Sequence, residues 1–168
     1  CCFVDMKISD SYHLEFNVFN TKTFEYSTYL KNNIKKVIQN KNSLLIAKLN
    51  DELGEFFLKS SCDFLKKNNV ELISLHGQTI SHIDGLSTKQ IGNPKFLSDF
   101  FDVPIIYDFR KQDIILGGRG APLIPFLDWL LFKNLNQDTV TLNIGGISNI
   151  TYIPKKSKRN DVIGFDTG

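Results

Sequence analysis

Cysteine is scarce in this sequence, and its three cysteines, Cys1, Cys2 and Cys62, form no recognisable framework. Adjacent cysteines rarely pair with each other and no CxxC motif is present, so neither a disulfide scaffold nor a zinc site is indicated. This usage is typical of a reducing compartment, and we expect a cytoplasmic protein. A cysteine hydrolase with Cys62 and His76 is a weak alternative, because Cys62 falls within a predicted helix without an orienting partner.

Long apolar runs and a strong charge of either sign are missing as well. No run approaches the length of a transmembrane helix, so we expect no membrane partner. Lys and Arg together number 20 against 18 Asp and Glu, which leaves a net charge of +2. The densest basic run, residues 155–159, is typical of a solvated turn. The sequence therefore argues against a nucleic-acid partner.

Apolar residues are abundant enough for a globular α/β protein, at 42% of the 168 residues. Their spacing predicts helices over 24–38, 42–67, 94–101 and 123–132, and a hairpin around Asp84-Gly85. It predicts strands at about 1–8, 12–20, 71–75, 103–107, 139–144, 147–153 and 162–165. We expect two sheets that divide near residue 135, with the strands at 1–6 and 103–107 buried.

The segment from Thr139 to Gly168 carries a glycine-based pattern. An apolar strand runs into Gly145-Gly146, a second strand leaves this pair, and Asp166 follows a third strand at about 162–165. Because glycine has no Cβ, backbone N–H groups at such a turn can approach an anion closely, and a carboxylate beyond it suits phosphoryl transfer. Two tight turns with a turn-capping aspartate explain the same pattern equally well.

Polar residues also follow the predicted strands at 71–75 and 103–107. The first strand leads into His76-Gly77-Gln78-Thr79, and the second leads into a glycine-rich loop that contains Arg110 and Asp113. Ligands of α/β proteins bind at the carboxyl ends of strands, so we expect Arg110 to reach toward residues 76–79 and to clamp a carboxylate or phosphate. The alternative is a structural loop in which Asp108 and Asp113 pair with Arg110.

Several motifs occur together and in one order. They are His76-Gly77-Gln78-Thr79-Ile80, Gln90-Ile91-Gly92-Asn93-Pro94, Asp108-Phe109-Arg110 with Asp113, Gly117-Gly118-Arg119-Gly120-Ala121-Pro122-Leu123, residues 142–149 and Gly164-Phe165-Asp166-Thr167-Gly168. In this combination the sequence resembles the anhydro-N-acetylmuramic acid kinase family of bacterial cell-wall recycling. The resemblance spans residues 76–168, whereas residues 1–75 are compatible in layout and carry no motif.

The resemblance implies an actin-like ATPase fold of the ribonuclease H-like type. Residues 1–134 would form the first α/β lobe, a mixed sheet with helices, and residues 135–168 would begin a second, similar lobe. The implied enzyme is a kinase of amino sugar metabolism that uses ATP, Mg²⁺ and water. It would open the 1,6-anhydro ring of anhydro-N-acetylmuramic acid and phosphorylate O6, giving N-acetylmuramic acid 6-phosphate. Its partners would be this sugar and ATP, and a homodimer is compatible with the resemblance.

The resemblance also assigns residues. Asp166 inherits the role of the base that deprotonates the attacking water. Asn143, Gly145 and Gly146 would bind the phosphates of ATP, and no protein ligand for a metal is assigned. The sugar pocket would be lined by His76, Gln78, Thr79, Gln90, Arg110 and Asp113.

The sequence departs from the family pattern in three places. The first phosphate loop of the family should directly precede Cys1 and is absent, and the chain stops at Gly168 where the second lobe should continue. Arg119 stands where the family usually has glutamine. We therefore expect a fragment at both ends that holds much of the sugar site and one phosphate hairpin. A truncated, catalytically inactive remnant of such a kinase is the alternative.

Overall fold

The computed structural model describes residues 1–66 and 68–168 and shows a mixed α/β architecture. Its helices are α1 (Thr28–Asn40), α2 (Ser43–Leu65), α3 (Lys95–Phe101), α4 (Phe109–Ile115) and α5 (Ile124–Phe132). Its strands are β1 (Cys2–Ile8), β2 (Leu14–Thr21), β3 (Ile73–Ser74), β4 (Gln78–Ile83), β5 (Ser87–Ile91), β6 (Ile105–Ile106), β7 (Thr139–Ile144), β8 (Ser148–Ile153) and β9 (Ile163–Asp166). A 3₁₀ turn over Arg159–Asp161 precedes β9.

The described strands form four small sheets, so the prediction of two sheets is wrong. The pairs β1–β2 and β4–β5 are antiparallel hairpins, β3 and β6 pair in parallel, and β7–β8–β9 form an antiparallel sheet. An apolar pattern identifies a strand but not its hydrogen-bonding partner, which is why the number of sheets was missed. The strand that begins at Thr139 lies in a different sheet from β6, as the expected division near residue 135 requires.

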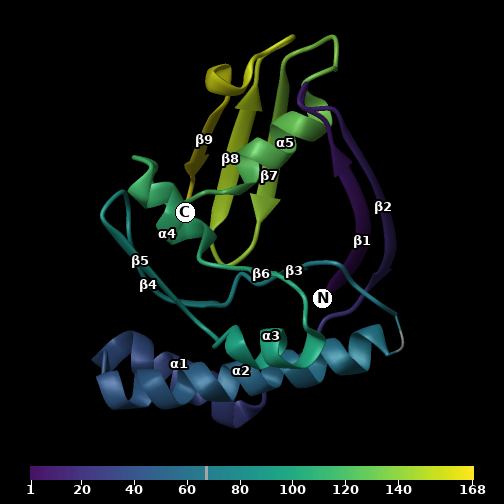
Figure 1. Cartoon of the computed structure of the whole chain (residues 1–168). Helices are drawn as coiled ribbons and strands as arrows, with labels where there is room; N and C mark the ends of the chain where they lie inside the picture. Colours follow the sequence, from purple (N-terminus) through teal and green to yellow (C-terminus); the bar gives the residue numbers. More distant parts are fainter. Residues whose placement is uncertain (67) are drawn as a thin grey trace.

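Helix α2 packs in the main core of the first half of the chain. It begins where the sequence predicts, because the Asn42 side chain accepts a hydrogen bond from the Leu45 N–H at 3.0 Å. Leu49 and Leu53, one turn apart, are completely buried. They belong to a core that joins α1, α2 and the β4–β5 hairpin: Leu30, Ile34, Val37, Leu49, Leu53, Ile80 and Ile91. Figure 1 shows α1, α2 and α3 together as one helical layer.

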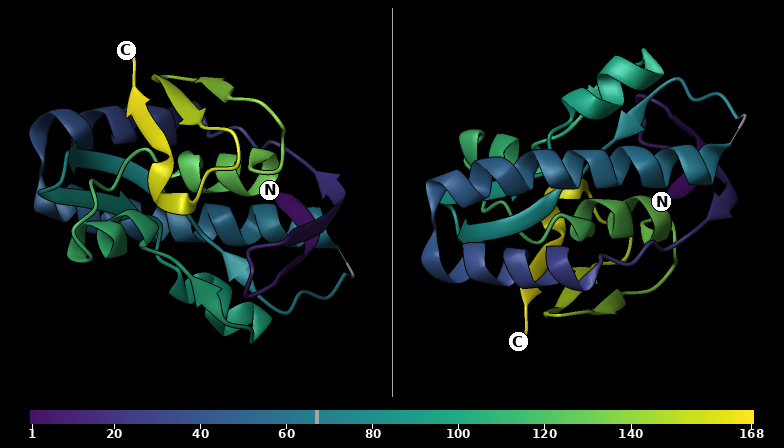
Figure 2. Two further views of the ribbon diagram at one scale, coloured as in Figure 1. Left: turned by 90° about the horizontal axis from the view of Figure 1, so that it is seen from above. Right: turned by 90° about the horizontal axis from the view of Figure 1, so that it is seen from below.

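A second, smaller core lies between α5 and the β7–β8–β9 sheet and contains Trp129, Leu130 and Ile153. The buried carboxylate of Asp128 accepts hydrogen bonds from the hydroxyls of Thr141 on β7 and Thr151 on β8, at 2.6 and 2.7 Å. In Figure 1 this sheet and α5 lie at the top, opposite the helical layer, and Figure 2 shows the same arrangement from above and below.

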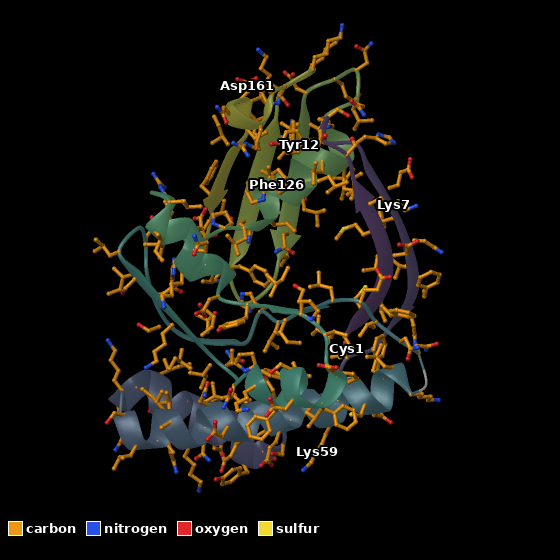
Figure 3. The ribbon with its side chains drawn as sticks, in the orientation of Figure 1. Cys1, Lys7, Tyr12, Lys59, Phe126 and Asp161 are labelled. Atoms are coloured by element: carbon orange, nitrogen blue, oxygen red, sulfur yellow. The ribbon has the colours of Figure 1, made fainter. Side chains whose placement is uncertain are left out.

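The β1–β2 hairpin connects these two regions. Near its open end, Lys22 forms an ion pair with Asp63 of α2. At its turn, the Tyr12 ring packs edge-on against Trp129 and Phe126 of α5, with centroids 5.4 and 6.2 Å apart, and Figure 3 shows Tyr12 close to Phe126. The hairpin is therefore attached at both ends by side-chain contacts.

Three local predictions are wrong. The strand at 1–6 is mostly exposed, with Met6 61% accessible, and Ile106 in β6 is 46% accessible, because nothing in the described part of the chain covers them. Residues 109–115, expected as a loop, form helix α4 directly after Asp108. The helix expected from residue 24 begins at Thr28, where the Ser27 hydroxyl caps it.

Candidate active site

Parallel pairing of β3 with β6 brings the two polar segments to one edge. Ile73 lies opposite Ile105, Ser74 lies opposite Ile106, and the Leu75 N–H continues the ladder to the Ile106 carbonyl. His76 therefore leaves this sheet beside the start of α4. The Arg110 Nε donates to His76 Nε2 at 3.0 Å, so the predicted approach of Arg110 to residues 76–79 is confirmed.

Arg110 is held from a second side by the glycine-rich loop. Its Nη1 donates to the Gly120 carbonyl at 2.8 Å, and the Gly120 N–H donates to Asp113 Oδ2 at the same distance. Among residues 1–66 and 68–168, neither Asp108 nor Asp113 forms an ion pair with Arg110, so the structural alternative is wrong about these pairs. Asp113 instead holds the loop, where a Cβ on Gly118 would overlap its carboxylate.

A cavity of about 190 Å³ opens beside this contact. It is lined by Asn50, Leu75, His76, Gly77, Gln90, Ile91, Gly92, Pro94, Tyr107 and Asp108. Two predicted sugar residues, His76 and Gln90, lie in its wall, whereas Gln78, Thr79, Arg110 and Asp113 lie outside the lining. Ligand pockets usually measure about 300–1,000 Å³, so this cavity can hold only part of a ligand.

Gln90 lines the cavity and carries one polar atom without a partner among the described residues. Its Nε2 donates to the hydroxyls of Thr79 and Thr88, at 3.1 and 2.8 Å. Its Oε1 is buried and has no hydrogen-bond partner among the described residues. The Gln78 amide is used differently, because it donates to the Thr79 carbonyl. A buried acceptor without a partner is unfavourable, because its hydrogen bond to water is lost on folding without replacement.

The Gly92-Asn93 part of the motif has a packing role. Gly92 adopts φ +123°, and a Cβ there would lie 2.2 Å from the Phe57 ring. The Gly92 N–H donates to the Asn50 side chain, and the Asn93 amide donates to Asp51. These contacts attach the end of β5 to α2 and so fix one wall of the cavity.

The glycine pair forms the predicted turn between β7 and β8. Neither Gly145 nor Gly146 has a φ in the left-handed region, and a Cβ on Gly146 would meet no described atom within 4 Å. At Gly145 the nearest atom would be the Ile147 carbonyl oxygen at 3.6 Å. Neither packing nor backbone conformation requires glycine here, which leaves room for a ligand to approach the backbone.

Asp166 is the last residue of β9 and is exposed. Strand register places it opposite Asn149, which is itself opposite Asn143, so the three residues form one row across the sheet. No side-chain hydrogen bond of Asp166 occurs within the described parts of the chain, so it does not cap a turn there. Beyond it, the Thr167 N–H donates to the Ser148 carbonyl and keeps the two strands paired.

Sequence reasoning missed Asn149. Its Oδ1 is buried without a partner in the described structure, beside the carboxylate to which the resemblance assigns catalysis. The signal was present, because Asn143 and Asn149 are equally spaced from the centre of the 145–147 turn and therefore face each other in a hairpin.

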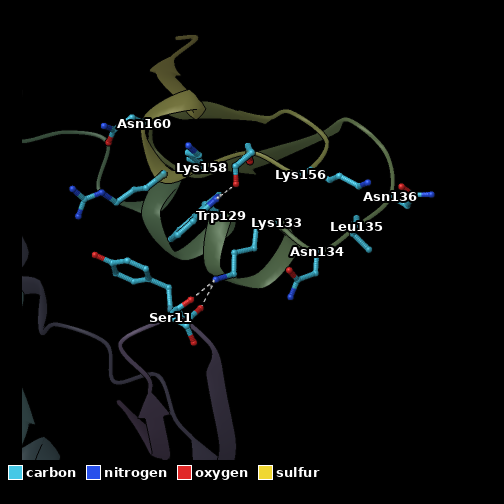
Figure 4. A pocket seen from close by; sticks show the side chains of 12 residues that line it. Ser11, Trp129, Lys133, Asn134, Leu135, Asn136, Lys156, Lys158 and Asn160 are labelled. Carbon is cyan, nitrogen blue, oxygen red and sulfur yellow. Dashed lines mark hydrogen bonds between the residues drawn. The ribbon is translucent and has the colours of Figure 1, made fainter.

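A larger cavity of about 740 Å³ lies elsewhere, between the β1–β2 turn, the end of α5 and the loop before β9. Figure 4 shows Trp129 donating to the Ser157 carbonyl and Lys133 donating to the carbonyls of Ser11 and Tyr12. This cavity contains none of the predicted site residues. We therefore place the candidate site at the smaller cavity, where the motif residues converge.

Comparison with known proteins gives a consistent result. Residues 3–168 match the family described as anhydro-N-acetylmuramic acid kinase. A protein of that name from Clostridioides difficile strain 630 is 42% identical over 161 residues, which are 87% of this chain and 42% of the relative. Those from Caldanaerobacter subterraneus subsp. tengcongensis and Bacillus cereus strain ATCC 10987 are each 38% identical, over 73% and 87% of this chain and 35% and 42% of the relatives.

All of these relatives are named as kinases, so the comparisons indicate a protein of the kinase class. The chain belongs to the anhydro-N-acetylmuramic acid kinase family. It spans about two fifths of the length of the curated relatives that it matches. No helix in the described part of the chain combines the length and the apolar character that a membrane crossing requires.

Proposed function

We propose that this chain provides part of an ATP-dependent kinase that opens 1,6-anhydro-N-acetylmuramic acid and phosphorylates O6. The observation that carries the proposal is the exposed carboxylate of Asp166, which has no hydrogen-bond partner among the described residues. It lies in a row with Asn143 and Asn149, and the turn between the strands of these two residues contains Gly145 and Gly146, whose backbone no side chain covers. A base next to a phosphate-accepting turn is the combination that this reaction needs. In this proposal residues 1–134 and 135–168 belong to two lobes of an actin-like fold.

The sugar binds at the cavity beside β3 and β6. Arg110 supplies a fixed cationic group. A rotation of the buried Gln90 amide would let its Oε1 accept a hydrogen bond from a hydroxyl or from the acetamido N–H. Gln78 and Thr79 support this wall, and Asp113 acts through Gly120, which keeps the loop in place behind Arg110.

The Gly145-Gly146 turn fits a phosphate group, because a nucleotide phosphate can approach backbone N–H groups that no side chain covers. Asn143 would add a side-chain amide from the same strand. ATP supplies the phosphoryl group, and Mg²⁺ would arrive bound to its phosphates. As in the resemblance, no protein ligand is assigned to the metal.

In the proposed reaction Asp166 accepts a proton from water while the water oxygen bonds to the anomeric carbon. The bond from that carbon to the bridging oxygen breaks. This oxygen, now O6, bonds to the γ-phosphorus of ATP, whose bond to the β–γ bridging oxygen breaks so that ADP leaves. Asn149 lies opposite Asp166 and would hold its carboxylate or the water in place. The proton stays on Asp166 until the product leaves, so charge and atoms balance.

The test is a turnover assay on the full-length protein with ATP and the anhydro sugar in ¹⁸O-labelled water. The expected product is N-acetylmuramic acid 6-phosphate with one ¹⁸O atom at C1, detected by mass spectrometry, and one ADP per sugar. N-Acetylglucosamine serves as the control acceptor. Phosphorylation without ¹⁸O incorporation would contradict hydrolytic ring opening, and absence of any phosphosugar would contradict the kinase assignment.

A further inference from the structure

His76 is held by two hydrogen bonds that together define its chemical state. The Arg110 Nε–H donates to Nε2 at 3.0 Å, and Nδ1 lies 2.9 Å from the Gly77 carbonyl oxygen. A guanidinium can only donate, so Nε2 must be the unprotonated nitrogen. A carbonyl oxygen can only accept, so Nδ1 must carry the proton. Both contacts require the same neutral tautomer.

This arrangement leaves the ring no hydrogen-bonding capacity for a ligand. The lone pair of Nε2 is used by Arg110, and the proton on Nδ1 is used by Gly77. His76 lies in the wall of the cavity, yet it could bind a sugar hydroxyl only by releasing Arg110. Its contribution to the site must then pass through the guanidinium.

The backbone holds the ring in this position. Gly77 adopts φ +72°, and a Cβ there would lie 2.9 Å from the Ile91 carbonyl oxygen, so the chain turns from β3 into β4 at a point that requires glycine. Gly120, with φ +79°, places its carbonyl on Arg110 Nη1 while Asp113 holds its N–H. The guanidinium is therefore fixed on its Nε edge and on Nη1. Its Nη2 has no acceptor among the residues that the structure describes.

We propose that His76 is a positioning residue that orients Arg110 and does not itself bind the sugar. This inference rests on the proposed sugar site. An arginine loses much rotamer freedom when a ligand fixes it, and a guanidinium fixed in advance avoids part of that cost. His76 thus increases sugar affinity without touching the sugar, and the free Nη2 edge is the part of Arg110 left for the ligand.

The test compares His76→Leu, which removes the acceptor, with His76→Gln, whose Oε1 can take the place of Nε2. Sugar affinity and turnover are measured on the full-length protein. We expect His76→Leu to weaken sugar binding about three- to tenfold with kcat within about twofold, and His76→Gln to restore binding. In the Arg110→Ala background, His76→Leu should have no further effect. His13→Leu, on the distant β1–β2 turn, is the control.

The other outcomes separate the alternatives. If His76→Gln binds as weakly as His76→Leu, or if His76→Leu adds its full effect to Arg110→Ala, His76 contacts the sugar directly and the proposal is overturned. A lower melting temperature with unchanged affinity would show a structural role only. If the wild-type protein does not bind the sugar at all, the proposed function itself fails and the positioning role fails with it.

A second measurement does not depend on the sugar. Nitrogen-15 NMR of labelled histidine reports the tautomer directly. We expect His76 in the wild-type protein to carry its proton on Nδ1, and the Arg110→Ala variant to lose this strict preference. A wild-type ring protonated on Nε2 would overturn the proposal whatever the binding data show.

Discussion

Two aspartates in the family motifs differ in what their carboxylates contact. Asp113 accepts the Gly120 N–H and holds a loop, whereas Asp166 is exposed without a hydrogen-bond partner in the described structure. A carboxylate that has no structural contact can be changed without loss of a fold contact, which makes Asp166 the better candidate for chemistry.

Replacement of Asp166 therefore separates catalysis from stability. Asp166→Asn keeps the side-chain shape but cannot take a proton, so kcat in the full-length protein should fall about 10²–10⁴-fold with little change in melting temperature. The matched control is Asp161→Asn, because Asp161 does cap a turn by accepting the Lys158 N–H. That variant should keep near-normal turnover. More than a tenth of wild-type kcat in Asp166→Asn would remove it as the base.

Gly92 is required by packing, and its replacement should be costly. Gly92→Ala places a Cβ on the Phe57 ring at φ +123°, so we expect a loss of about 2–5 kcal/mol in the free energy of unfolding. Gly85→Ala is the control, because φ is +66° there but no described atom lies within 4 Å, and it should cost about 1 kcal/mol. Denaturant unfolding of the full-length protein measures both, and equal losses would contradict the packing argument.

At the scale of elements, Asp128 joins α5 to two strands. Asp128→Leu leaves the Thr141 and Thr151 hydroxyls without their acceptor, and we expect a loss of about 2–4 kcal/mol in the free energy of unfolding. The triple variant with Thr141→Val and Thr151→Val removes all three polar groups and should recover most of that loss. Denaturant unfolding compares the variants, and a triple variant as unstable as Asp128→Leu would contradict the argument.

The ion pair between the β1–β2 hairpin and α2 gives a pH dependence. The Lys22 ammonium lowers the pKa of Asp63 from its ordinary value. A carboxyl with a lowered folded-state pKa stabilises the fold above its unfolded-state pKa, and the stabilisation disappears as the pH falls through the folded-state pKa. Both side chains are well exposed, so the effect on stability should be small and sensitive to salt.

Lys22→Gln tests this contact directly. NMR titration of Asp63 should show its pKa moving up toward the ordinary value in the variant. Lys31→Gln, which removes a cation from α1 that pairs with Glu25 instead, is the control and should leave Asp63 unchanged. An unchanged Asp63 titration in Lys22→Gln would show that the pair is not formed in solution.

At the scale of the whole molecule, the chain exposes more surface than its mass predicts. Its accessible surface is 11422 Å², whereas a compact monomer of 19.2 kDa is expected to expose about 8,400 Å². The excess includes apolar side chains along β1 and β7, such as Met6, Val140, Leu142 and Ile144. Figure 1 shows β1–β2 and β7–β8–β9 on one side of the helical layer.

We expect the 168-residue chain by itself to associate through these surfaces. The measurements are binding of the dye ANS and size-exclusion chromatography, with a full-length relative as the control. Val140→Thr together with Leu142→Thr should reduce ANS binding. A chain that elutes as a compact monomer without ANS binding would contradict this expectation.

The sequence by itself determined the local elements, because the signals that form them lie within a few residues of each other. Examples are the Asn42 cap that starts α2, the hairpin around Gly85 and the glycine pair between β7 and β8. Motif recognition added the family, which the comparisons confirm. The polar segments at the ends of two predicted strands indicated that Arg110 approaches residues 76–79, and the structure confirms this contact.

Only the tertiary structure decided which strands pair and which side chains remain free. The pairing of β3 with β6, the pairing of Asn149 with Asp166 and the contact of Arg110 with His76 each join residues far apart in the chain. A local pattern carries no information on such partners, since hydrogen-bonding register and side-chain contacts arise only when the elements meet. For the same reason the sequence identified His76 only as a candidate for the site. The structure added that its ring accepts a hydrogen bond from Arg110.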